Sequence, residues 1–505
     1  MAKVSTQISL TAVVFFDVLS AVPLYRQLYD SIRSAILSGQ LVSGFKLPGS
    51  REMAREFGVS RNTITGAFDQ LIAEGYLEAQ IGSGTFVSKK IPDELLYASN
   101  KSNSQAPKNK SKRGLSERGK TIAATLVTFP PNQKRLRPFA PCLPSVEDFP
   151  FGLWAKLAGH RLRYPTRNLL NYGEAAGYRP LREEIAAYLG AARGVRCAPE
   201  QVVVVSGIQQ AVDLTARILL DAGDAAWVED PGYLGSRGAM IAAQARIVPV
   251  PVDAEGIEVE TGKKLAPEAR LACVTPSHQF PLGLTMSLAR RLELLEWASR
   301  AGAWILEDDY DSEFRYEGRP FAALQGLDND NRVIYAGTFS KVLSPALRIG
   351  YLVAPPDLVD AFTAGKALLD RHSPIFEQMI LADFFAEGHF ARHVRRMRNL
   401  YAERRDTFIS AAKSELDGLL EIAPSAAGLH LMGWLNNNLN DTTAARAAAE
   451  NGVDCEPLSA LSIRKPNRQG LVLGYASFDE KEIKEGAKRL AAALQKVLRK
   501  HQANQ

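Results

Sequence analysis

The sequence contains few cysteines, and they are scattered along the chain. Among 505 residues there are four, Cys142, Cys197, Cys273 and Cys455, and no two have the short spacing of a metal-binding or redox pair. This distribution argues against a disulfide framework and against a zinc site, so we predict that no metal is bound. Reduced thiols are typical of proteins that stay in the cytoplasm, and we expect a cytoplasmic protein.

A long hydrophobic run is also missing. The segment from Ile8 to Ala21 is apolar, but Asp17 interrupts it and only Lys3 precedes it. It is shorter than the roughly 20 residues that cross a bilayer, and its flanks are not those of a signal peptide. We therefore expect no membrane contact, and we predict that this segment is a short strand packed on the domain that follows.

Excess charge is absent from most of the chain. The net charge of +6 arises within residues 1–120, which hold 16 Lys and Arg against 10 Asp and Glu, whereas the remaining residues hold 45 of each. A positive balance confined to one region is typical of a region that meets the phosphates of a nucleic acid. The first quarter of the chain is therefore the candidate for nucleic-acid binding.

The chain is too long for one ordinary domain, and its composition divides it into three regions. Residues 20–88 show dense helical periodicity. Residues 89–134 are predicted to form a flexible basic linker, because Ser99 to Lys120 has almost no large apolar side chains. In residues 135–505, apolar runs alternate with helical patterns, which predicts an α/β fold with a mostly parallel sheet and flanking helices. From Asp417 onward, strands and helices mix as in a smaller α+β subdomain. The apolar runs are Gln201–Val205, Ala226–Val228, Ala245–Val252, Leu271–Thr275, Trp304–Leu306 and Val333–Ala336, with Gly470–Tyr475 in the subdomain.

The first region has the spacing of a helix-turn-helix. Leu24, Leu28, Ile32 and Ile36 lie on one face of a first helix. Ser50 is predicted to cap a second helix that extends to Phe57. After the turn at residues 58–60, a third helix is predicted over residues 61–74.

The start of this third helix carries residue types that suit DNA. Ser60 can cap the helix, and Arg61, Asn62 and Thr63 in its first turn can reach phosphates and base edges. Residues 77–87 then form a predicted hairpin, with Gly82-Ser83-Gly84 at its tip. A three-helix domain without DNA contacts is the alternative.

This region resembles the winged helix of the GntR family over its whole length, which implies that it binds a double-stranded DNA operator. By this resemblance, Arg51 and Arg61 contact the DNA backbone and Thr63 reaches the groove. Gly82 and Gly84 correspond to the wing. Proteins of this type usually have serine where Gly49 stands. The DNA-binding set is Arg51, Ser60, Arg61, Asn62, Thr63, Gly82 and Gly84.

A second group of residues surrounds Lys341. The lysine follows the run Val333–Ala336, at the edge where sites form in open parallel sheets. Lysine forms Schiff bases with carbonyl cofactors. The hydroxyls of Thr338 and Ser340 and the guanidinium of Arg348 suit a phosphate. The alternative is a solvated surface lysine, which is what most lysines are.

Acids follow the run Trp304–Leu306. A carboxylate at Asp308 can hold a protonated pyridine nitrogen, with Tyr310 close behind it. For Asp309 and Asp311 we expect the plainer role of loop acids that cap a helix.

A turn follows the run Gln201–Val205. Ser206, Gly207 and Ile208 stand at a predicted helix start, where free amides and the helix dipole form a phosphate cradle.

From Phe139 onward the chain resembles a fold-type I aminotransferase, which implies a homodimer and pyridoxal 5′-phosphate bound as an aldimine to Lys341. By this resemblance, Tyr233 stacks on the pyridine ring, Tyr310 lies near its phenolic oxygen, and Tyr172 reaches the phosphate across the dimer. Ordinary core tyrosine is the alternative for Tyr233. Lys341 is the catalytic candidate, and the cofactor-binding set is Lys341, Asp308, Tyr310, Tyr233, Ser206, Gly207, Ile208, Thr338, Ser340, Arg348, Tyr172 and His278.

Two motifs resemble those of a smaller group of proteins than the aminotransferases as a whole. His278-Gln279-Phe280-Pro281-Leu282-Gly283 replaces the aminotransferase form Asn-Pro-Thr-Gly, so that Phe280 stands where an asparagine bonds the cofactor. This form and Glu307–Tyr316 resemble the MocR/GabR regulators. The resemblance implies a transcriptional regulator that senses pyridoxal phosphate or an amine effector through Lys341. An active aminotransferase with an appended DNA-binding domain is the alternative, and a residual half-reaction is compatible with either.

In such proteins an arginine of the C-terminal subdomain binds the carboxylate of the effector, and this arginine is missing here. Its position falls on Leu471 or Val472, and Gly235 stands two residues after Tyr233, where a second arginine occurs. A buried aliphatic side chain cannot hold a carboxylate. We therefore expect no ordinary amino acid as effector. Either another basic residue, such as Arg237, substitutes, or the sensed species is the cofactor itself.

Overall fold

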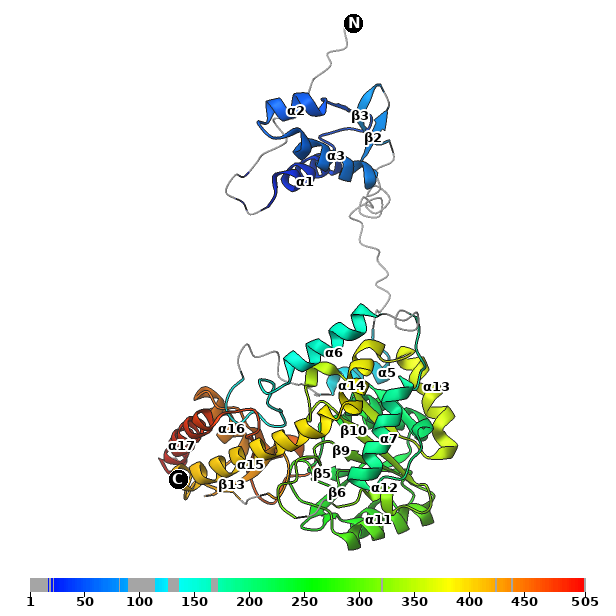
Figure 1. Ribbon diagram of the computed structural model, residues 1–505. Helices are drawn as coiled ribbons and strands as arrows, with labels where there is room; N and C mark the ends of the chain where they lie inside the picture. The colour runs from blue at the N-terminus through cyan, green and yellow to red at the C-terminus, as the bar shows by residue number, and fades with distance from the viewer. Residues whose placement is uncertain are drawn as a thin grey trace. The chain divides into compact units, whose positions relative to one another are not determined.

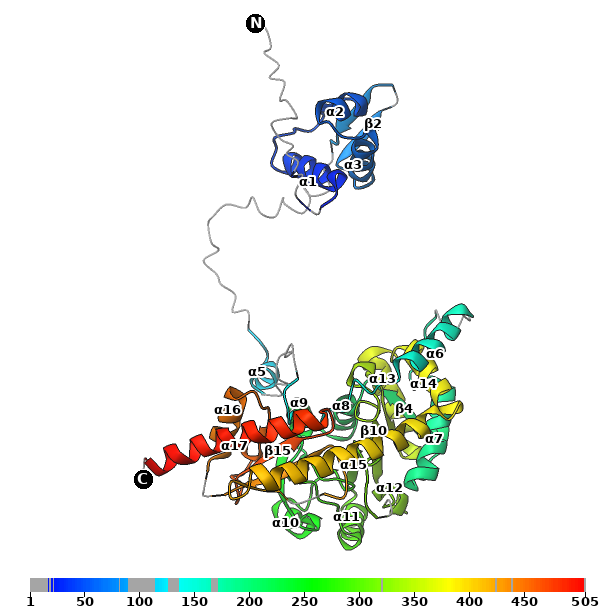
Figure 2. The same ribbon diagram turned by 60° about the vertical axis from the view of Figure 1, so that its left-hand side comes forward.

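The computed structural model describes residues 17, 20, 22–80, 82–89, 114–125, 136–164, 171–318, 321–422, 425–436 and 439–503. They form two compact units, which divide the chain between Gly114 and Leu115 (Figures 1 and 2). The strand expected over residues 8–21 lies outside the described residues, apart from positions 17 and 20. Within these described ranges, no helix combines the length and the apolar character that crossing a bilayer requires.

The first unit consists of three helices and a three-stranded antiparallel sheet. The helices are α1 (Leu24–Leu37), α2 (Ser50–Glu56) and α3 (Arg61–Ala73), and the sheet has the order β1 (Lys46–Leu47), β3 (Gly84–Val87), β2 (Leu77–Gln80). The predicted helices and hairpin are present. The strand β1 was not predicted, because two residues are too few to show a period.

The core of the first unit lies between α1 and α3. Leu28 and Ile32 of α1 pack with Ile64 and Phe68 of α3, as their spacing predicts. Leu24, predicted to face inward, is instead 36% exposed, because the first turn of α1 extends past this core.

The caps of α2 and α3 differ. The Ser60 hydroxyl accepts the backbone N–H of Thr63 at 3.1 Å, so the predicted cap of α3 is confirmed. The predicted cap of α2 is wrong, because Gly49 occupies that position and Ser50 is the first helical residue. The Ser50 hydroxyl instead accepts the Nε–H of Arg61 at 3.4 Å. This contact joins the starts of the two helices.

The described part of the predicted linker contains a helix, α5 (Glu117–Ala124). The Ser116 hydroxyl caps it by accepting the Gly119 N–H at 3.0 Å. This helix falls in the second compact unit and packs against α9 (Leu234–Ala242). The expectation of a flexible segment is therefore wrong for residues 117–124, where a serine cap starts a helix that low apolar content did not suggest.

An eight-stranded sheet forms the centre of the second unit. Its order is β4 (Val202–Val205), β11 (Gly350–Val353), β10 (Val333–Thr338), β9 (Trp304–Asp309), β8 (Leu271–Val274), β5 (Ala225–Asp230), β6 (Arg246–Asp253), β7 (Gly256–Ile257). The strands from β10 to β6 are parallel, and β11 runs antiparallel to both of its neighbours. The predicted mostly parallel sheet is confirmed.

Helices cover both faces of this sheet because successive side chains of each strand point to opposite sides. Ala226 and Val228 pack with α8 and α9, whereas Trp227 packs with Trp297 and Leu294 of α11. The helices of this unit up to the subdomain are α6 (Phe151–Arg163), α7 (Arg179–Arg193), α8 (Ile208–Leu219), α9, α10 (Val259–Leu265), α11 (Leu288–Ala301), α12 (Leu324–Leu327), α13 (Val359–Asp370) and α14 (Ile375–Ala386).

A smaller α+β subdomain completes the second unit, as predicted. Its antiparallel sheet has the order β12 (Leu420–Ile422), β13 (His430–Leu435), β15 (Gly470–Gly474), β14 (Glu456–Pro457). Its helices are α16 (Asp441–Glu450) and α17 (Glu480–Ala503), and the long α15 (His389–Glu415) lies beside α17 (Figure 2). One face of the small sheet packs on these helices, and the other meets Phe280 and Leu234.

Candidate functional site

Lys341 lies just beyond the carboxyl end of β10. It is partly buried, and its Nζ donates a hydrogen bond to the backbone carbonyl of Cys142 at 2.6 Å. A solvated surface lysine is therefore excluded. Lys341 follows β10, whereas Cys142 belongs to the segment before α6. The fold therefore brings together two residues that are 199 positions apart in the sequence.

Asp308 lies on β9, which is the neighbour of β10, the strand that leads to Lys341. It pairs in register with Ala336 of β10, and it is 6% exposed. Burial raises its pKa well above the usual range, and the neighbouring carboxyls of Asp309 and Glu229 raise it further. Its Oδ1 has no hydrogen-bond partner among the described residues. A buried carboxyl with an unpaired oxygen is suited to an N–H⁺ group from a ligand.

The turn between β4 and α8 is the predicted phosphate cradle, and it lies close to Arg348. Gly207 has φ +125°, a conformation that favours glycine, and a Cβ there would lie 3.3 Å from the Arg348 guanidinium. The Ser340 hydroxyl is buried and has no partner among the described residues. An arginine therefore lies at the N-terminus of α8, a combination that suits an anion, and Ser340 offers a free hydroxyl.

Two predicted phosphate ligands are already engaged within the chain. The Thr338 hydroxyl accepts the backbone N–H of Ser340 at 3.1 Å, so it orients Ser340. The N–H of Ser206 donates to the side chain of Gln210 at 2.8 Å. The amide of Ile208, at the first position of α8, has no such partner within the helix.

Aromatic side chains surround the space next to Asp308. Tyr233 donates to Gln209 at 3.1 Å and meets the edge of Phe280, with 6.4 Å between ring centroids. Phe280 in turn meets Tyr310 edge-on at 6.3 Å. Tyr233 is thus partly buried beside Asp308, in a cavity that both residues line, and is not an ordinary core tyrosine.

His278 supports Tyr310 from behind. Its Nδ1 lies 3.0 Å from the Tyr310 hydroxyl and 3.0 Å from Oδ2 of Asp311, and both His278 and Asp311 are almost fully buried. A Cβ at Gly428 would collide with the imidazole, so only glycine fits there. His278 therefore acts on the site through Tyr310.

The expectation for Asp309 and Asp311 is wrong, since neither acid caps a helix. Asp309 forms a buried ion pair with Arg193 at 2.9 Å, and Asp311 pairs with His278. Each acid points into the interior because it has a buried partner supplied by a distant segment.

Three buried side chains lie close enough together to hold a metal ion: His278, Asp311 and His430. Nδ1 of His278 meets Asp311 and Tyr310, and Nε2 of His430 meets the Pro281 carbonyl at 3.1 Å, whereas Nε2 of His278 has no partner among the described residues. We assign these groups to hydrogen bonding.

Tyr172 stands apart from the other predicted cofactor ligands. It is 68% exposed, and the Arg371 guanidinium covers its ring at 3.6 Å. The structure of one chain does not bring it to Lys341, and its predicted role across a dimer stays a prediction.

The missing arginine has a structural explanation. Val472 packs with Phe280 and Leu461, on the face of the small sheet that meets the site, whereas Leu471 packs among the helices behind it. The site-facing position is therefore Val472. At Gly235 a Cβ would collide with Gln209 and the Tyr233 ring, so no side chain fits there.

Pyridoxal 5′-phosphate fits the residues described. Asp308 Oδ1 is a buried acceptor for the pyridine nitrogen, and the Ser340 hydroxyl and Arg348 stand at the cradle for the phosphate. Lys341 supplies the amine for the aldehyde. The unpaired buried oxygens are explained by such a ligand.

The predicted DNA-binding residues lie on the first unit. Arg51, Arg61 and Asn62 are exposed, and the Arg61–Ser50 contact holds the two helix starts together. The Thr63 hydroxyl lies 2.9 Å from that of Ser60, so it forms part of the cap. Gly82 and Gly84 have φ of +77° and +112°, as a tight wing turn requires.

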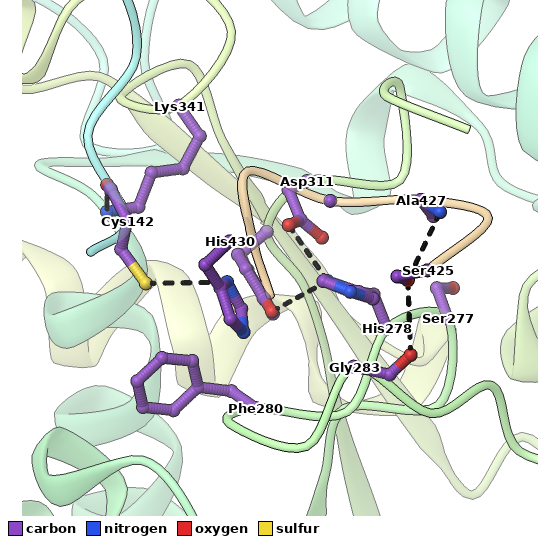
Figure 3. Close-up of polar contacts among 12 residues, drawn as sticks. Cys142, Ser277, His278, Phe280, Gly283, Asp311, Lys341, Ser425, Ala427 and His430 are labelled. Atoms are coloured by element: carbon purple, nitrogen blue, oxygen red, sulfur yellow. Dashed lines mark hydrogen bonds and ion pairs between the residues drawn. The ribbon is translucent and has the colours of Figure 1, made fainter. Parts of the chain in front are cut away.

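Several residues were missed by sequence reasoning. Cys142 and His430 border Lys341 and are contributed by the segment before α6 and by β13 (Figure 3). Gln209 positions Tyr233, and Lys46 of β1 lies against Gly84 of the wing, 3.0 Å from the position of a Cβ there. The positive φ of Cys142, 60°, belongs to the folded state and leaves no pattern in the sequence.

Glu229 gives a pH-dependent stability prediction. It is buried against Thr275 and Gln279, and burial raises its pKa from 4.5 to about 7. A raised carboxyl pKa stabilises the fold below the unfolded-state value, and this stability is lost as pH rises through the folded-state value. Between about pH 4.5 and about pH 8, wild type should lose about 3 kcal/mol relative to Glu229→Gln. Urea unfolding of both proteins across this range measures the difference, and a pH-independent difference would contradict the prediction.

The comparisons with known proteins agree with both units. Residues 24–87 match the bacterial regulatory proteins of the gntR family, and residues 154–490 match the aminotransferases of class I and II. The chain is 43% identical over 475 residues to the probable rhizopine catabolism regulatory protein MocR of Rhizobium meliloti, covering 94% of each chain. It is 31% identical to the pyridoxine biosynthesis transcriptional regulator PdxR of Corynebacterium glutamicum, covering 91% of this chain and 93% of that one.

A solved aminotransferase has the fold of the second unit. The chain resembles LysN, the α-aminoadipate aminotransferase of Thermus thermophilus complexed with N-(5′-phosphopyridoxyl)-L-leucine, with a TM-score of 0.67 and 30% identity. The match covers 72% of this chain and 93% of that one. Together with the two family matches in this order, these similarities show that the chain belongs to the MocR-type transcriptional regulators, in which a GntR winged helix precedes an aminotransferase domain.

Proposed function

We propose that this transcriptional regulator binds its operator through the winged helix and senses pyridoxal phosphate, or an amine that reacts with it, at Lys341. The observation that carries the proposal is the pair of unpartnered buried oxygens, on Asp308 of β9 and on Ser340, the residue before Lys341. When bound, the cofactor supplies an aldehyde that exchanges amines and a ring that withdraws electrons.

Different residues of this chain would bind different parts of the cofactor. Asp308 would keep the pyridine nitrogen protonated, because the buried carboxylate is stabilised by a positive charge next to it. Arg348 and the α8 N-terminus attract the phosphate. His278 fixes Tyr310 at hydrogen-bonding distance, and Tyr233 covers the ring.

We propose further that the protein acts as a cytoplasmic homodimer. Tyr172, exposed and distant from the contacts of its own Lys341, would then reach the phosphate of the partner subunit, as the resemblance implies. A two-fold dimer would present two winged helices to two half-sites of the operator.

The decisive experiment is a DNA-binding titration against the region upstream of the protein's own gene. Fluorescence anisotropy would be measured for the apoprotein, the protein with pyridoxal phosphate, and the protein with pyridoxal phosphate plus candidate amines. We expect ligand to change the affinity about 5- to 150-fold, the usual range of coupling between two sites. An affinity unchanged by every ligand contradicts sensing at Lys341.

The second candidate is an aminotransferase that carries a DNA-binding domain. Lys341, Asp308, Tyr310 and Arg348 are the chemical parts that such an enzyme needs, and all four are in place. Steady-state turnover of amino and keto acids at roughly 1–10³ s⁻¹ would support this candidate. A single slow half-reaction would not.

Arg61→Ala tests the assignment of the recognition helix. Arg61 is exposed at the start of α3, and loss of one phosphate contact should weaken binding to every DNA sequence. The slope of log affinity against log salt concentration should fall by about 1. The matched control is Arg26→Ala in the same unit, whose guanidinium is paired with Asp30 at 3.5 Å. If Arg61→Ala binds DNA like this control at low salt, α3 is not the recognition helix.

A further inference from the structure

The small-subdomain sheet presents one face to Lys341 and its surroundings. On β13 and β15 alternate residues share a face, so His430 and Met432 lie with Val472 and Gly474 on it. Val472 and Met432 belong to an apolar cluster with Phe280 and Leu461. At Gly474 a Cβ would collide with the Ala140 carbonyl, so the segment that carries Cys142 runs directly over this face.

His430 is the polar side chain of this face nearest to Lys341, and its protonation state follows from its contacts. Its Nε2 lies 3.1 Å from the Pro281 carbonyl, which can only accept, so Nε2 carries the hydrogen. Burial, together with the nearby His278 and the charge of Lys341, lowers its pKa to about 3. His430 is therefore neutral, and its Nδ1 is an acceptor.

That acceptor faces the Cys142 thiol. The sulfur lies 3.9 Å from Nδ1, at the long end of a contact with a weak S–H donor. The backbone carbonyl of the same cysteine accepts Lys341 Nζ. Figure 3 shows Cys142 next to both Lys341 and His430, and the Phe280 ring meets the imidazole edge-on with 5.5 Å between centroids. A neutral acceptor, a thiol and apolar side chains thus form the wall beside the reactive amine.

This wall is unsuited to an anion. A carboxylate placed against it would meet the lone pair of His430 and the side chains of Val472 and Phe280, none of which can replace its hydration. Arg237 lines the cavity that Tyr233 and Asp308 also line, and the buried acids of that cavity, Asp308 and Glu229, oppose a second carboxylate. Arg348 belongs to the phosphate cradle.

We propose that the effector of this regulator is a primary amine that has no carboxylate and carries a neutral hydrogen-bond donor, such as a hydroxyl, for Nδ1 of His430. The inference rests on the proposed function, since it names the class of amine sensed at Lys341. The effector nitrogen replaces the lysine nitrogen at the cofactor carbon, and Lys341 leaves as a free amine, so the exchange is balanced and needs no oxidant. The ligand hydroxyl displaces the weak thiol contact of Cys142.

The test is a titration of the full-length protein loaded with pyridoxal phosphate, using matched ligands. Tyramine is compared with tyrosine and with tyrosine methyl ester, and ethanolamine with serine and with propylamine. Binding is followed by visible absorption and by calorimetry. We expect tyramine to bind at least about 10-fold more tightly than tyrosine, because the carboxylate is desolvated without a partner. The methyl ester should behave like tyramine, and ethanolamine should bind several-fold more tightly than propylamine.

Two variants assign these preferences to the wall. Val472→Arg places a guanidinium on the site-facing strand position and should reverse the order of tyramine and tyrosine. His430→Leu should remove the preference for ethanolamine over propylamine while leaving the order of tyramine and tyrosine unchanged. Both positions are fully buried, so cofactor absorption and thermal unfolding check the fold of each variant. If neither variant folds, the wild-type titration alone decides.

The outcomes separate this inference from the proposed function. Tighter binding of tyrosine or serine than of the matched amines would overturn the inference and leave amine sensing intact. A DNA affinity that responds to pyridoxal phosphate, with no response of the spectrum to any amine or amino acid, would overturn both the inference and amine sensing.

Discussion

Lys341→Ala should abolish covalent attachment of pyridoxal phosphate completely. Lys341 follows β10, the strand that pairs with Asp308, and its Nζ donates to the Cys142 carbonyl. Without it no Schiff base to the protein can form at this site. Borohydride treatment in excess cofactor, followed by intact mass measurement, should add one phosphopyridoxyl group to the wild type and none to the variant.

The controls separate loss of chemistry from loss of fold. Lys341 is only partly buried and its hydrogen bond goes to a backbone carbonyl, so alanine should leave thermal unfolding almost unchanged. Lys481→Ala, which replaces an exposed lysine on α17, should keep the mass increase. DNA affinity of the apoprotein should be the same for both variants. If Lys341→Ala also loses apo DNA binding, the two units are not functionally separable.

Asp308→Asn should lower the affinity for the cofactor about 10²- to 10⁴-fold. Removing one partner of a buried ion pair leaves the other uncompensated, which costs about 3–5 kcal/mol. Asparagine keeps the size of the side chain, so the change is in charge alone. Equilibrium dialysis against pyridoxal phosphate, with Lys341 intact in both proteins, measures the loss.

The same substitution should have the opposite effect on the apoprotein. Burial and the nearby acids raise the pKa of Asp308, so at neutral pH the empty site is destabilised by the cost of burying the charged carboxylate or of protonating it. The neutral amide of Asp308→Asn removes this cost and should raise the melting temperature without ligand. Asp309→Asn is the matched control one residue away: it breaks the Arg193 pair and should lower stability with and without cofactor. Equal behaviour of the two variants would contradict the role assigned to Asp308.

Sequence reasoning was reliable where local pattern decides the outcome. The valine run at residues 202–205 and the run at 333–336 are strands, and both are apolar throughout because both of their faces are buried. The Ser60 cap followed from its position before an amphipathic run. Lys341 and Asp308 could be placed together because the carboxyl ends of parallel strands share an edge.

Sequence reasoning was unreliable where contact with a distant segment decides the role of a residue. Ser50 is a helical residue that contacts Arg61, and Asp311 is buried because His278 pairs with it. His430 and Cys142 meet across 288 positions of sequence, and neither belongs to a recognisable local pattern. The α5 helix was missed because Ser116 starts a short helix whose side chains are almost all exposed, so no apolar period marks it.

The packing of α5 on α9 joins the start of the second unit to the surroundings of Tyr233. α9 begins directly after Tyr233, which lines a cavity together with Asp308. Any displacement of α9 would therefore change its contact with α5, the first helix of the second unit among the described residues.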